Sequence, residues 1–359
     1  MTRPDIGAAG SGDFAEIPVV DISLWRGNQN DRDALATQVR TICHEIGFFV
    51  IINHGIPTEF IDSVFTMMDH LFELPPDQKQ LIDKVDSRHF RGWEATGAEY
   101  TNNRPDIREQ VDFWTEHPPR SSNVDPEYLR LLGPNQWLPD SILPGFEALV
   151  NEWFDRLGAL GDELVEILSV SLGLDEGHID RLFGDERMSL TKLINYPPTP
   201  SDQMGVNAHH DAGFLTILAP GSTPGLQVQN SLEEWIPVPI MAGSFVINLG
   251  EMLQGMTGNY FVATPHRVVT DSPRKSAGYF HGPSLTASLD PLPLAPEFAE
   301  AVAASPRHSL AGFMARKEET AAGVGDMQSD HKPGVYGEQL WNYFARSYPD
   351  NMDRHYGNV

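Results

Sequence analysis

The chain has one cysteine, half as many basic as acidic residues, and no long apolar run, and each shortage excludes a class of protein. With Cys43 alone, internal disulfides are excluded and a reducing, cytoplasmic location is expected. The 25 lysines and arginines face 50 aspartates and glutamates, and a net charge of −25 repels phosphate backbones and anionic lipid. No apolar run approaches the roughly 18 residues of a membrane helix, and residues 1–16 lack the apolar segment of a signal peptide. We therefore expect neither nucleic acid nor a membrane as a partner.

Hydrophobic periodicity divides the rest of the chain into helices and strands. Hydrophobic residues make up 40% of the sequence, which is enough for a large core. Between Phe146 and Leu172 they recur with a period near 3.6, which predicts a long scaffold helix that ends before Gly173. Similar patterns predict further helices over about 31–46, 58–74 and 336–346, and strands over 17–21 and 48–52.

From residue 188 to 283 the pattern changes to short strands separated by glycine, proline and asparagine turns. Strands are predicted at 190–196, 215–218, 225–228, 244–247, 260–262 and 277–280. Such closely spaced strands predict an all-β barrel or jelly roll. We therefore divide the chain into a disordered tail (1–16), a helical and mixed region (17–187), a β core (188–285) and a C-terminal extension with a capping helix (286–359), which includes a polar loop at 317–334.

Three side chains in the second half have the ligand types of a non-haem iron site. His209 and Asp211 form a His-x-Asp pair, and His266 follows in a Pro-His-Arg-Val stretch. On a strand, residues two apart face the same side, so His209 and Asp211 can share a metal, whereas His210 should face away. Two imidazoles and one carboxylate on one face of an octahedron leave three positions open, as in non-haem Fe(II) oxygenases. An isolated His-x-Asp is common at solvated strand ends, so the prediction depends on the whole set.

A candidate anion site follows shortly downstream. Arg274 and Ser276 are two residues apart, so on a strand they share a face and offer a guanidinium and a hydroxyl to an anionic co-substrate. The same pair alone would also suit a surface strand. Beside the three metal-ligand candidates, a binding role is favoured.

Several further stretches together resemble the Fe(II)/2-oxoglutarate-dependent dioxygenases of the isopenicillin N synthase-like family. The resemblance covers about 17–285 and extends weakly through 336–337 and 346–349. The chain departs from the family's usual pattern at Gly250-Glu251 and at Thr257-Gly258-Asn259, neither of which is expected to ligate the metal. The stretches that carry the resemblance lie at 17–21, 47–49, 53–57, 91–93, 106–109, 195–197, 208–216, 225–228, 248–251, 264–268 and 273–276.

The resemblance implies a mainly β protein with α elements, in which a double-stranded β-helix (jelly-roll) core is flanked by helices. It implies that His209, Asp211 and His266 bind Fe(II) and that 2-oxoglutarate chelates the iron. It also implies that Arg274 pairs with the distal carboxylate of 2-oxoglutarate, and that Ser276 and Tyr196 donate hydrogen bonds to it. The expected reaction consumes O₂, decarboxylates 2-oxoglutarate to succinate, and hydroxylates, desaturates or cyclises a small molecule.

Three alternatives stay open at this point. Some members of the family use no 2-oxoglutarate and apply the same arginine and serine to the carboxylate of the substrate itself. Others form ethylene, and the weak C-terminal similarity is reminiscent of them. A β-helix protein used only for binding is disfavoured, because the three metal-ligand candidates are all present.

The sequence says least about the substrate. Lys192 should share a strand face with Ile194 and Tyr196, and a lysine in an apolar cavity needs an anion. A small substrate with a carboxylate is therefore expected, unless Lys192 pairs with a neighbouring acid such as Glu251. Further candidates for the substrate pocket, each of which would also suit a structural role, are Arg91, Trp93, Tyr100, Trp114, Phe280 and His281.

Overall fold

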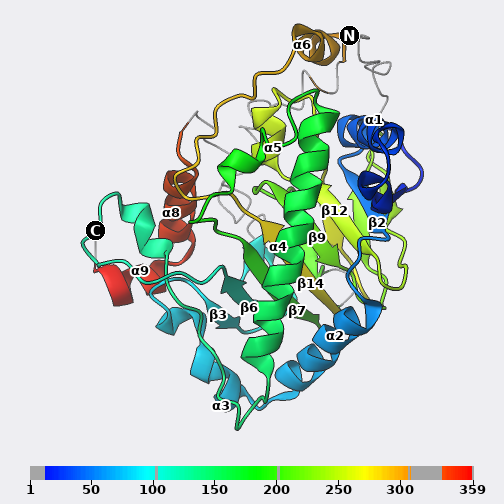
Figure 1. Ribbon diagram of the computed structural model, residues 1–359. Helices are drawn as coiled ribbons and strands as arrows, with labels where there is room; N and C mark the ends of the chain where they lie inside the picture. The colour runs from blue at the N-terminus through cyan, green and yellow to red at the C-terminus, as the bar shows by residue number, and fades with distance from the viewer. Residues whose placement is uncertain (1–12, 102–103, 200–202, 306–307, 309–333, 358–359) are drawn as a thin grey trace.

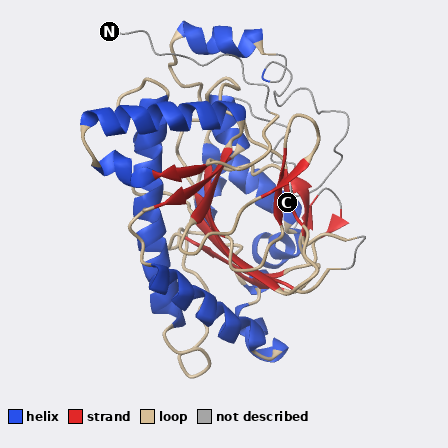
Figure 2. Cartoon of the chain, turned by 90° about the vertical axis from the view of Figure 1, so that its right-hand side faces the viewer, coloured by secondary structure: helices blue, strands red, loops and turns tan. Residues whose placement is uncertain are grey.

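The computed structural model describes residues 13–101, 104–199, 203–305, 308 and 334–357. Strands occupy the centre of the molecule and helices pack outside them (Figures 1 and 2). Most of the predicted tail (1–16) and of the predicted polar loop (317–334) lies outside the described residues. Of the helices in the described ranges, none combines the length and the apolar character that crossing a bilayer requires.

In the described part of the chain eight α-helices surround the core, and local chemistry explains how α1 begins. The side chain of Asn28 accepts hydrogen bonds from the backbone of Asn30 and Asp31, and the Asp31 carboxylate accepts one from the backbone N–H of Asn28, which fixes the first turn of α1. The helices are α1 (Gln29–Glu45), α2 (Thr58–Glu73), α3 (Pro76–Lys79), α4 (Phe146–Ser171), α5 (Glu251–Met256), α6 (Pro296–Ala304), α8 (Tyr336–Ser347) and α9 (Pro349–Tyr356).

The strands form two main sheets and one short ribbon. The large sheet has the order β1-β2-β12-β9-β14-β7-β6-β3, the second sheet has the order β11-β10-β13-β8, and β4 pairs with β5. The strands are β1 (Val19–Asp21), β2 (Phe48–Ile52), β3 (Gly92–Glu94), β4 (Tyr100–Thr101), β5 (Arg104–Pro105), β6 (Glu109–Trp114), β7 (Leu190–Tyr196), β8 (Val206–His209), β9 (Leu215–Ala219), β10 (Leu226–Gln229), β11 (Trp235–Pro237), β12 (Phe245–Leu249), β13 (His266–Val268) and β14 (Arg274–His281).

The two main sheets face each other across an apolar interior. Ile194 and Val246 of the large sheet pack in one cluster with Val206, Val228 and Val268 of the second sheet. This arrangement is the predicted jelly roll with flanking helices, and the fold prediction is confirmed. Strands from both sides of the predicted boundary at residue 187 belong to the large sheet, so the sheet is continuous across that boundary. The division into regions stays a prediction.

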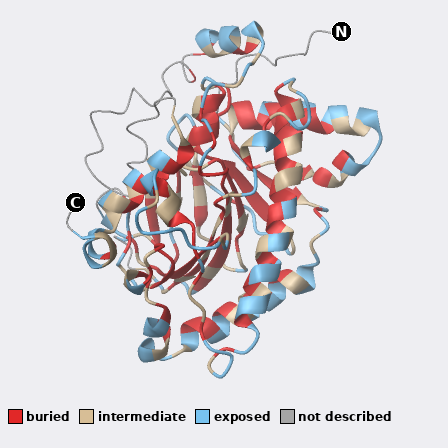
Figure 3. Cartoon of the chain, turned by 60° about the vertical axis from the view of Figure 1, so that its left-hand side comes forward, coloured by how far each residue is buried: buried red, intermediate tan, exposed pale blue. Residues whose placement is uncertain are grey.

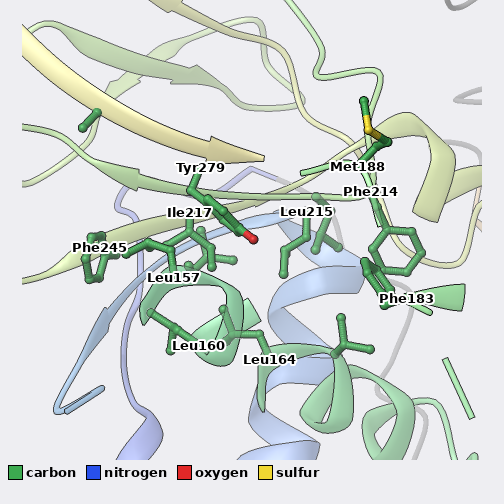
Figure 4. Packing of buried hydrophobic residues seen from close by; sticks show 14 of the residues in the cluster. Leu157, Leu160, Leu164, Phe183, Met188, Phe214, Leu215, Ile217, Phe245 and Tyr279 are labelled. Carbon is green, nitrogen blue, oxygen red and sulfur yellow. The ribbon is translucent and has the colours of Figure 1, made fainter. Parts of the chain in front are cut away.

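The long helix α4 covers the outer face of the large sheet. Figure 4 shows Tyr279 and Ile217 of the sheet directed toward Leu157, Leu160 and Leu164 of the helix. All five side chains are buried. Buried residues concentrate on the strands and on the helix faces that meet them (Figure 3). The apolar stripe of α4 therefore has the predicted scaffold role. Burial of each of its large apolar side chains stabilises the fold by about 1.5–3 kcal/mol.

Two local predictions were wrong. The apolar run from Tyr260 to Val262 is a loop and not a strand. Its backbone is satisfied by α1 instead of by a sheet, because Val262 N donates to Cys43 O (3.1 Å) and Tyr260 O accepts from His44 Nδ1 (2.7 Å). Burial without strand pairing produces the same sequence pattern. Strand β8 ends at His209, so strand alternation does not extend to Asp211 as predicted.

Candidate active site

Two adjacent strands of the second sheet and the loop after one of them bring the three metal-ligand candidates together. His209 ends β8, His266 begins β13, and the two residues are direct partners in the β8–β13 pairing. Asp211 lies two residues past His209, in the loop that leaves the strand. The Nε2 atoms of both histidines lie 3.5 Å from Asp211 Oδ1, and the three potential ligand atoms lie within 4.8 Å of one another. His210 is not a member of this group and lies beside Glu251.

The backbone orients both imidazoles. His209 Nδ1 is 2.8 Å from Asn207 O, and His266 Nδ1 is 3.2 Å from Thr264 O. In each case Nδ1 donates to a carbonyl oxygen, which fixes the tautomer that leaves Nε2 as the free lone pair. Both Nε2 atoms face Asp211, which is the arrangement that a shared metal ion requires.

The carboxylate is oriented in the same way. Asp211 Oδ2 accepts hydrogen bonds from Thr216 Oγ1 (2.5 Å) and Asn248 Nδ2 (2.8 Å), which leaves Oδ1 directed at the histidines. Burial disfavours the charged form of Asp211, but in the metal-free site the protonated imidazoles of His266 and His209 outweigh it and hold the pKa of that carboxyl well below its ordinary value. Asp211 is therefore ionised at neutral pH, which is the state that ligates a metal. The donor set fits Fe(II).

The start of α5 holds the loop that carries Asp211. Glu251 N donates to Asp211 O (2.8 Å), and Met252 N donates to Gly213 O (3.3 Å). A Cβ atom at Gly250 would lie 1.9 Å from Gly213 O, so only glycine permits this approach. Sequence reasoning treated Gly250-Glu251 as a departure from the family pattern and did not recognise this structural role.

The candidate anion site lies on neighbouring strands of the large sheet, facing the interior. Arg274 is paired with Tyr196, and Ser276 is paired with Ile194, a member of the interior cluster. The guanidinium carbon of Arg274 lies 4.9 Å from the centre of the Tyr196 ring. Its Nη2 donates to Pro220 O (3.2 Å), whereas Nε and Nη1 are buried without a hydrogen-bond partner among the described residues. A buried guanidinium with unused donors suits an anionic ligand.

Two glycines make room for these side chains. A Cβ atom at Gly205 would lie 2.8 Å from the ring of Tyr196, and one at Gly225 would lie 3.2 Å from Cδ of Arg274. The sequence analysis assigned this packing role to neither glycine, although Gly225 opens the 225–228 stretch, because each close approach depends on how the two sheets meet.

A cavity of about 170 Å³ opens beside His209 and Asp211. The substrate candidates Lys192, Trp114, Phe280 and His281 line it. Arg91, Trp93 and Tyr100 do not line it.

Arg91 is fully buried and donates to Leu131 O (3.2 Å), away from the cavity. Trp93 is paired with Val111, on the opposite face of the sheet from the cavity-lining Asp112, and its Nε1 donates to Glu109 Oε1 (2.8 Å). Tyr100 is 49% exposed on the short strand β4. The structure does not bring these three residues to the cavity.

Sequence reasoning missed the acids that face Lys192. Lys192 Nζ lies 3.3 Å from Glu99 Oε1 and 3.1 Å from Asp112 Oδ2. Burial disfavours ionisation of Glu99, but Arg108 and Lys192 outweigh it and hold the pKa of its carboxyl below the ordinary value. The protein itself therefore supplies the anions that Lys192 needs, from residues other than Glu251. Alternation along β6 places Asp112 on the same face as Trp114, but no strand was predicted over these residues.

Aromatic residues from the C-terminal extension complete the cavity. Tyr336, Tyr343 and Phe344 of α8 and the following Tyr348 line it. Figure 1 shows α8 and α9 on the side of the molecule away from α1 and α2. The predicted capping helix therefore contributes a wall of the site.

Comparisons with known proteins agree with this geometry. Residues 17–140 match the family described as non-haem dioxygenase in morphine synthesis N-terminal, and residues 184–283 match the 2OG-Fe(II) oxygenase superfamily. The chain is 33% identical to the 2-oxoglutarate-dependent dioxygenase frbJ of Dothideomycetidae sp. (strain 11243) over 289 residues, which covers 77% of each chain. It is 26% identical to the 1-aminocyclopropane-1-carboxylate oxidase of Dictyostelium mucoroides, over 97% of this chain and 99% of that protein.

The fold is also that of solved structures. A full-length Neurospora crassa protein crystallised with alpha-KG superposes with a TM-score of 0.73 at 23% identity, covering 95% of this chain and 99% of the other. These findings confirm the predicted family, fold class, enzyme class and cofactors. The chain belongs to the 2OG-Fe(II) oxygenase superfamily and is a 2-oxoglutarate-dependent dioxygenase, which uses Fe(II), 2-oxoglutarate and O₂ to oxidise a small molecule.

Proposed function

We propose that this dioxygenase holds Fe(II) with His209, Asp211 and His266, and that it oxidises its substrate in the adjoining cavity. One observation carries the proposal: the second heteroatom of each of these side chains is hydrogen-bonded to the protein, and the remaining three atoms converge. The iron, when bound, supplies the activation of O₂. The chain's own residues supply orientation and exclude water.

We assign the distal carboxylate of 2-oxoglutarate to Arg274, with Ser276 and Tyr196 beside it. Two unused donors on a guanidinium that is 2% exposed support this assignment, because an unpaired buried charge is costly. The fork of Arg274 can hold a carboxylate through two parallel hydrogen bonds. This contact fixes the co-substrate at the end that is remote from the metal ligands.

We also propose a cytoplasmic enzyme that acts on a small molecule and not on nucleic acid. The net charge of −25 and the single, buried cysteine support this proposal. A carboxylate on the substrate, predicted from Lys192, is a separate proposal. The Dictyostelium relative supports it, because that protein is named for a carboxylate, 1-aminocyclopropane-1-carboxylate. The ion pairs of Lys192 with Glu99 and Asp112 count against it, because they already supply the anion that Lys192 was expected to need from the substrate.

The test is an anaerobic titration with Fe(II), followed by measurement of succinate formation under O₂. Asp211→Ala should lose most of its iron affinity and all turnover, because it removes the only carboxylate of the triad. His210→Ala is the matched control and should keep its iron. Retention of iron by Asp211→Ala, or its loss in His210→Ala, would contradict the assignment. Oxidation by the wild type without 2-oxoglutarate would favour the 2-oxoglutarate-independent alternative.

A further inference from the structure

Four charged residues that line the cavity, Glu99, Arg108, Asp112 and Lys192, belong to an alternating chain of acids and bases that begins and ends with an acid. Lys84 lies between Glu94 and Asp112, and Asp112 also contacts Lys192. Lys192 reaches Glu99, which contacts Arg108, and Arg108 reaches Asp106. Their order is Glu94, Lys84, Asp112, Lys192, Glu99, Arg108 and Asp106.

This charged wall (the seven residues just named) carries four carboxylates and three cations, so its formal charge is −1. Each cation lies between two of the carboxylates. Arg108 Nη2, for example, is 2.6 Å from Glu99 Oε2 and 3.1 Å from Asp106 Oδ2. The positive charges are therefore matched within the protein, and the excess charge is negative.

The charged wall lies close to the candidate iron site. Asp106 Oδ1 accepts hydrogen bonds from Asn207 N (3.2 Å) and Nδ2 (3.0 Å), and Asn207 is two residues before His209 on β8. Glu99 and Asp112, which are 7% and 3% exposed, both line the cavity that His209 lines. A group bound at these acids would therefore belong to a molecule that extends toward the metal ligands.

The acids that line the cavity have acceptor capacity left. Asp112 Oδ1 is buried and accepts no hydrogen bond from the described residues. Both contacts of Lys192 to Glu99 are 3.3 Å long, whereas charge-assisted hydrogen bonds of this type are usually about 2.7–2.9 Å. A further donor beside Glu99 would therefore add to these contacts without breaking an existing pair.

Much of the remaining lining is aromatic, which also favours a positively charged ligand. The faces of aromatic rings attract cations, and the attraction grows when water is excluded. Lys84 Nζ already lies 4.8 Å from the centre of the Tyr348 ring. The aromatic side chains that line the cavity include Trp114, Phe280, Tyr343, Phe344 and Tyr348.

We propose that Glu99 and Asp112 bind a cationic nitrogen of the substrate, as an ammonium or a guanidinium group. A cation brings the charged wall to neutrality, whereas a carboxylate would raise its excess charge to −2 and would have to compete with Glu99 and Asp112 for Lys192. This inference rests on the proposed function, because it takes the cavity beside His209 as the place of oxidation. It names the chemical group by which that cavity selects its substrate.

The test uses four probes of similar size: hexylamine, agmatine, hexanol and hexanoate. Binding is measured by anaerobic calorimetry on the wild-type enzyme loaded with Fe(II) and 2-oxoglutarate. Hexylamine and agmatine should bind at least tenfold more tightly than hexanol, and hexanoate should bind most weakly. Equal affinity for hexylamine and hexanol, or no binding of either cation, would overturn the inference.

Three variants then locate the contact. Asp112→Asn and Glu99→Gln, which keep the side-chain shapes, should each weaken hexylamine binding tenfold or more and change hexanol binding little. Lys192→Met removes a competing cation and should tighten hexylamine binding severalfold. Lys275→Met is the control, since Lys275 pairs with Asp69 outside this cavity and should leave all four affinities unchanged.

Two results would point elsewhere. Preferential binding of hexanoate that disappears in Lys192→Met would replace the cationic group by the carboxylate first predicted. A wild type that fails to bind Fe(II) or 2-oxoglutarate in the loading step would contradict the proposed function itself, so the two failures are separable. Circular dichroism of each variant separates a lost contact from a lost fold, and either acid variant alone suffices to test the contact.

Discussion

Replacement of Arg274 by alanine gives the sharpest prediction about the co-substrate. Arg274 is 2% exposed, and its Nε and Nη1 have no partner among the described residues, so its charge is available to a ligand. Removal of one member of a desolvated charge pair typically costs about 2–5 kcal/mol. At about 1.4 kcal/mol per factor of ten, the affinity for 2-oxoglutarate should fall by roughly 30-fold to several thousand-fold. Iron affinity should be retained, because Arg274 is not a member of the metal-ligand group.

The assay compares 2-oxoglutarate with 2-oxopentanoate, in which a methyl group replaces the distal carboxylate. Anaerobic calorimetry in the presence of Fe(II) gives both affinities for the wild type and for Arg274→Ala. The wild type should strongly prefer 2-oxoglutarate, and the variant should lose most of that preference. Arg274→Lys should recover part of it, because lysine restores the charge but not the two parallel hydrogen bonds. The neighbouring Lys275→Met is the control, since its side chain faces the other side of β14.

The outcome that would refute the reasoning is an unchanged preference in Arg274→Ala with iron still bound. In that case the distal carboxylate would lie elsewhere, and the unused donors of Arg274 would need another explanation. A wild type that shows no preference would favour the open alternative in which the arginine holds the carboxylate of the substrate.

Three further predictions concern the scaffold. Gly250→Ala should lower iron affinity at least tenfold, measured by Fe(II) titration, because its Cβ would displace the loop that carries Asp211; unchanged affinity would show that the loop can adapt. Leu160→Ala should lower the free energy of unfolding by about 2–5 kcal/mol in denaturant titrations and leave iron binding intact, because α4 lies outside the site. Burial lowers the pKa of His89 to about 4 from 6.5, so stability should be complete above pH 6.5 and should fall as the pH drops from 6.5 toward 4. His89→Gln should show a smaller fall over that interval, and equal slopes in the two proteins would assign the loss of stability to other groups.

The metal-ligand candidates could be predicted because their chemistry is local in the sequence. His209 and Asp211 are two residues apart, and His266 stands in a short recognisable stretch. The structure adds what the sequence could not supply, which is the direct pairing of His209 with His266 across β8 and β13. The strand argument for Asp211 was wrong because β8 ends at His209, two residues before Asp211, yet the loop that follows brings the carboxylate beside both histidines.

The charged wall could not be predicted, because its members meet only through long-range strand pairing. Asp112 and Lys192 are partners across β6 and β7, and 79 residues separate them in the chain. A register shift of one residue would place Asp112 on the outer face and remove the contact. The strand predicted at 260–262 was wrong for a related reason. The apolar sequence indicates that Tyr260 is buried, but it does not indicate which element covers it.

The iron site and the walls of the substrate cavity come from different parts of the chain, which affects how the enzyme selects its substrate. The iron and 2-oxoglutarate candidates lie within the second half of the chain, from Tyr196 to Ser276, on strands or, for Asp211, on the loop after β8. The charged wall comes largely from residues 84–112, and the aromatic wall comes largely from α8. Substitutions in the charged wall or in α8 can therefore change the charge and shape of the cavity while the metal ligands and Arg274 keep their contacts. On this argument, Asp112→Asn should change which molecule is oxidised without changing how 2-oxoglutarate is bound.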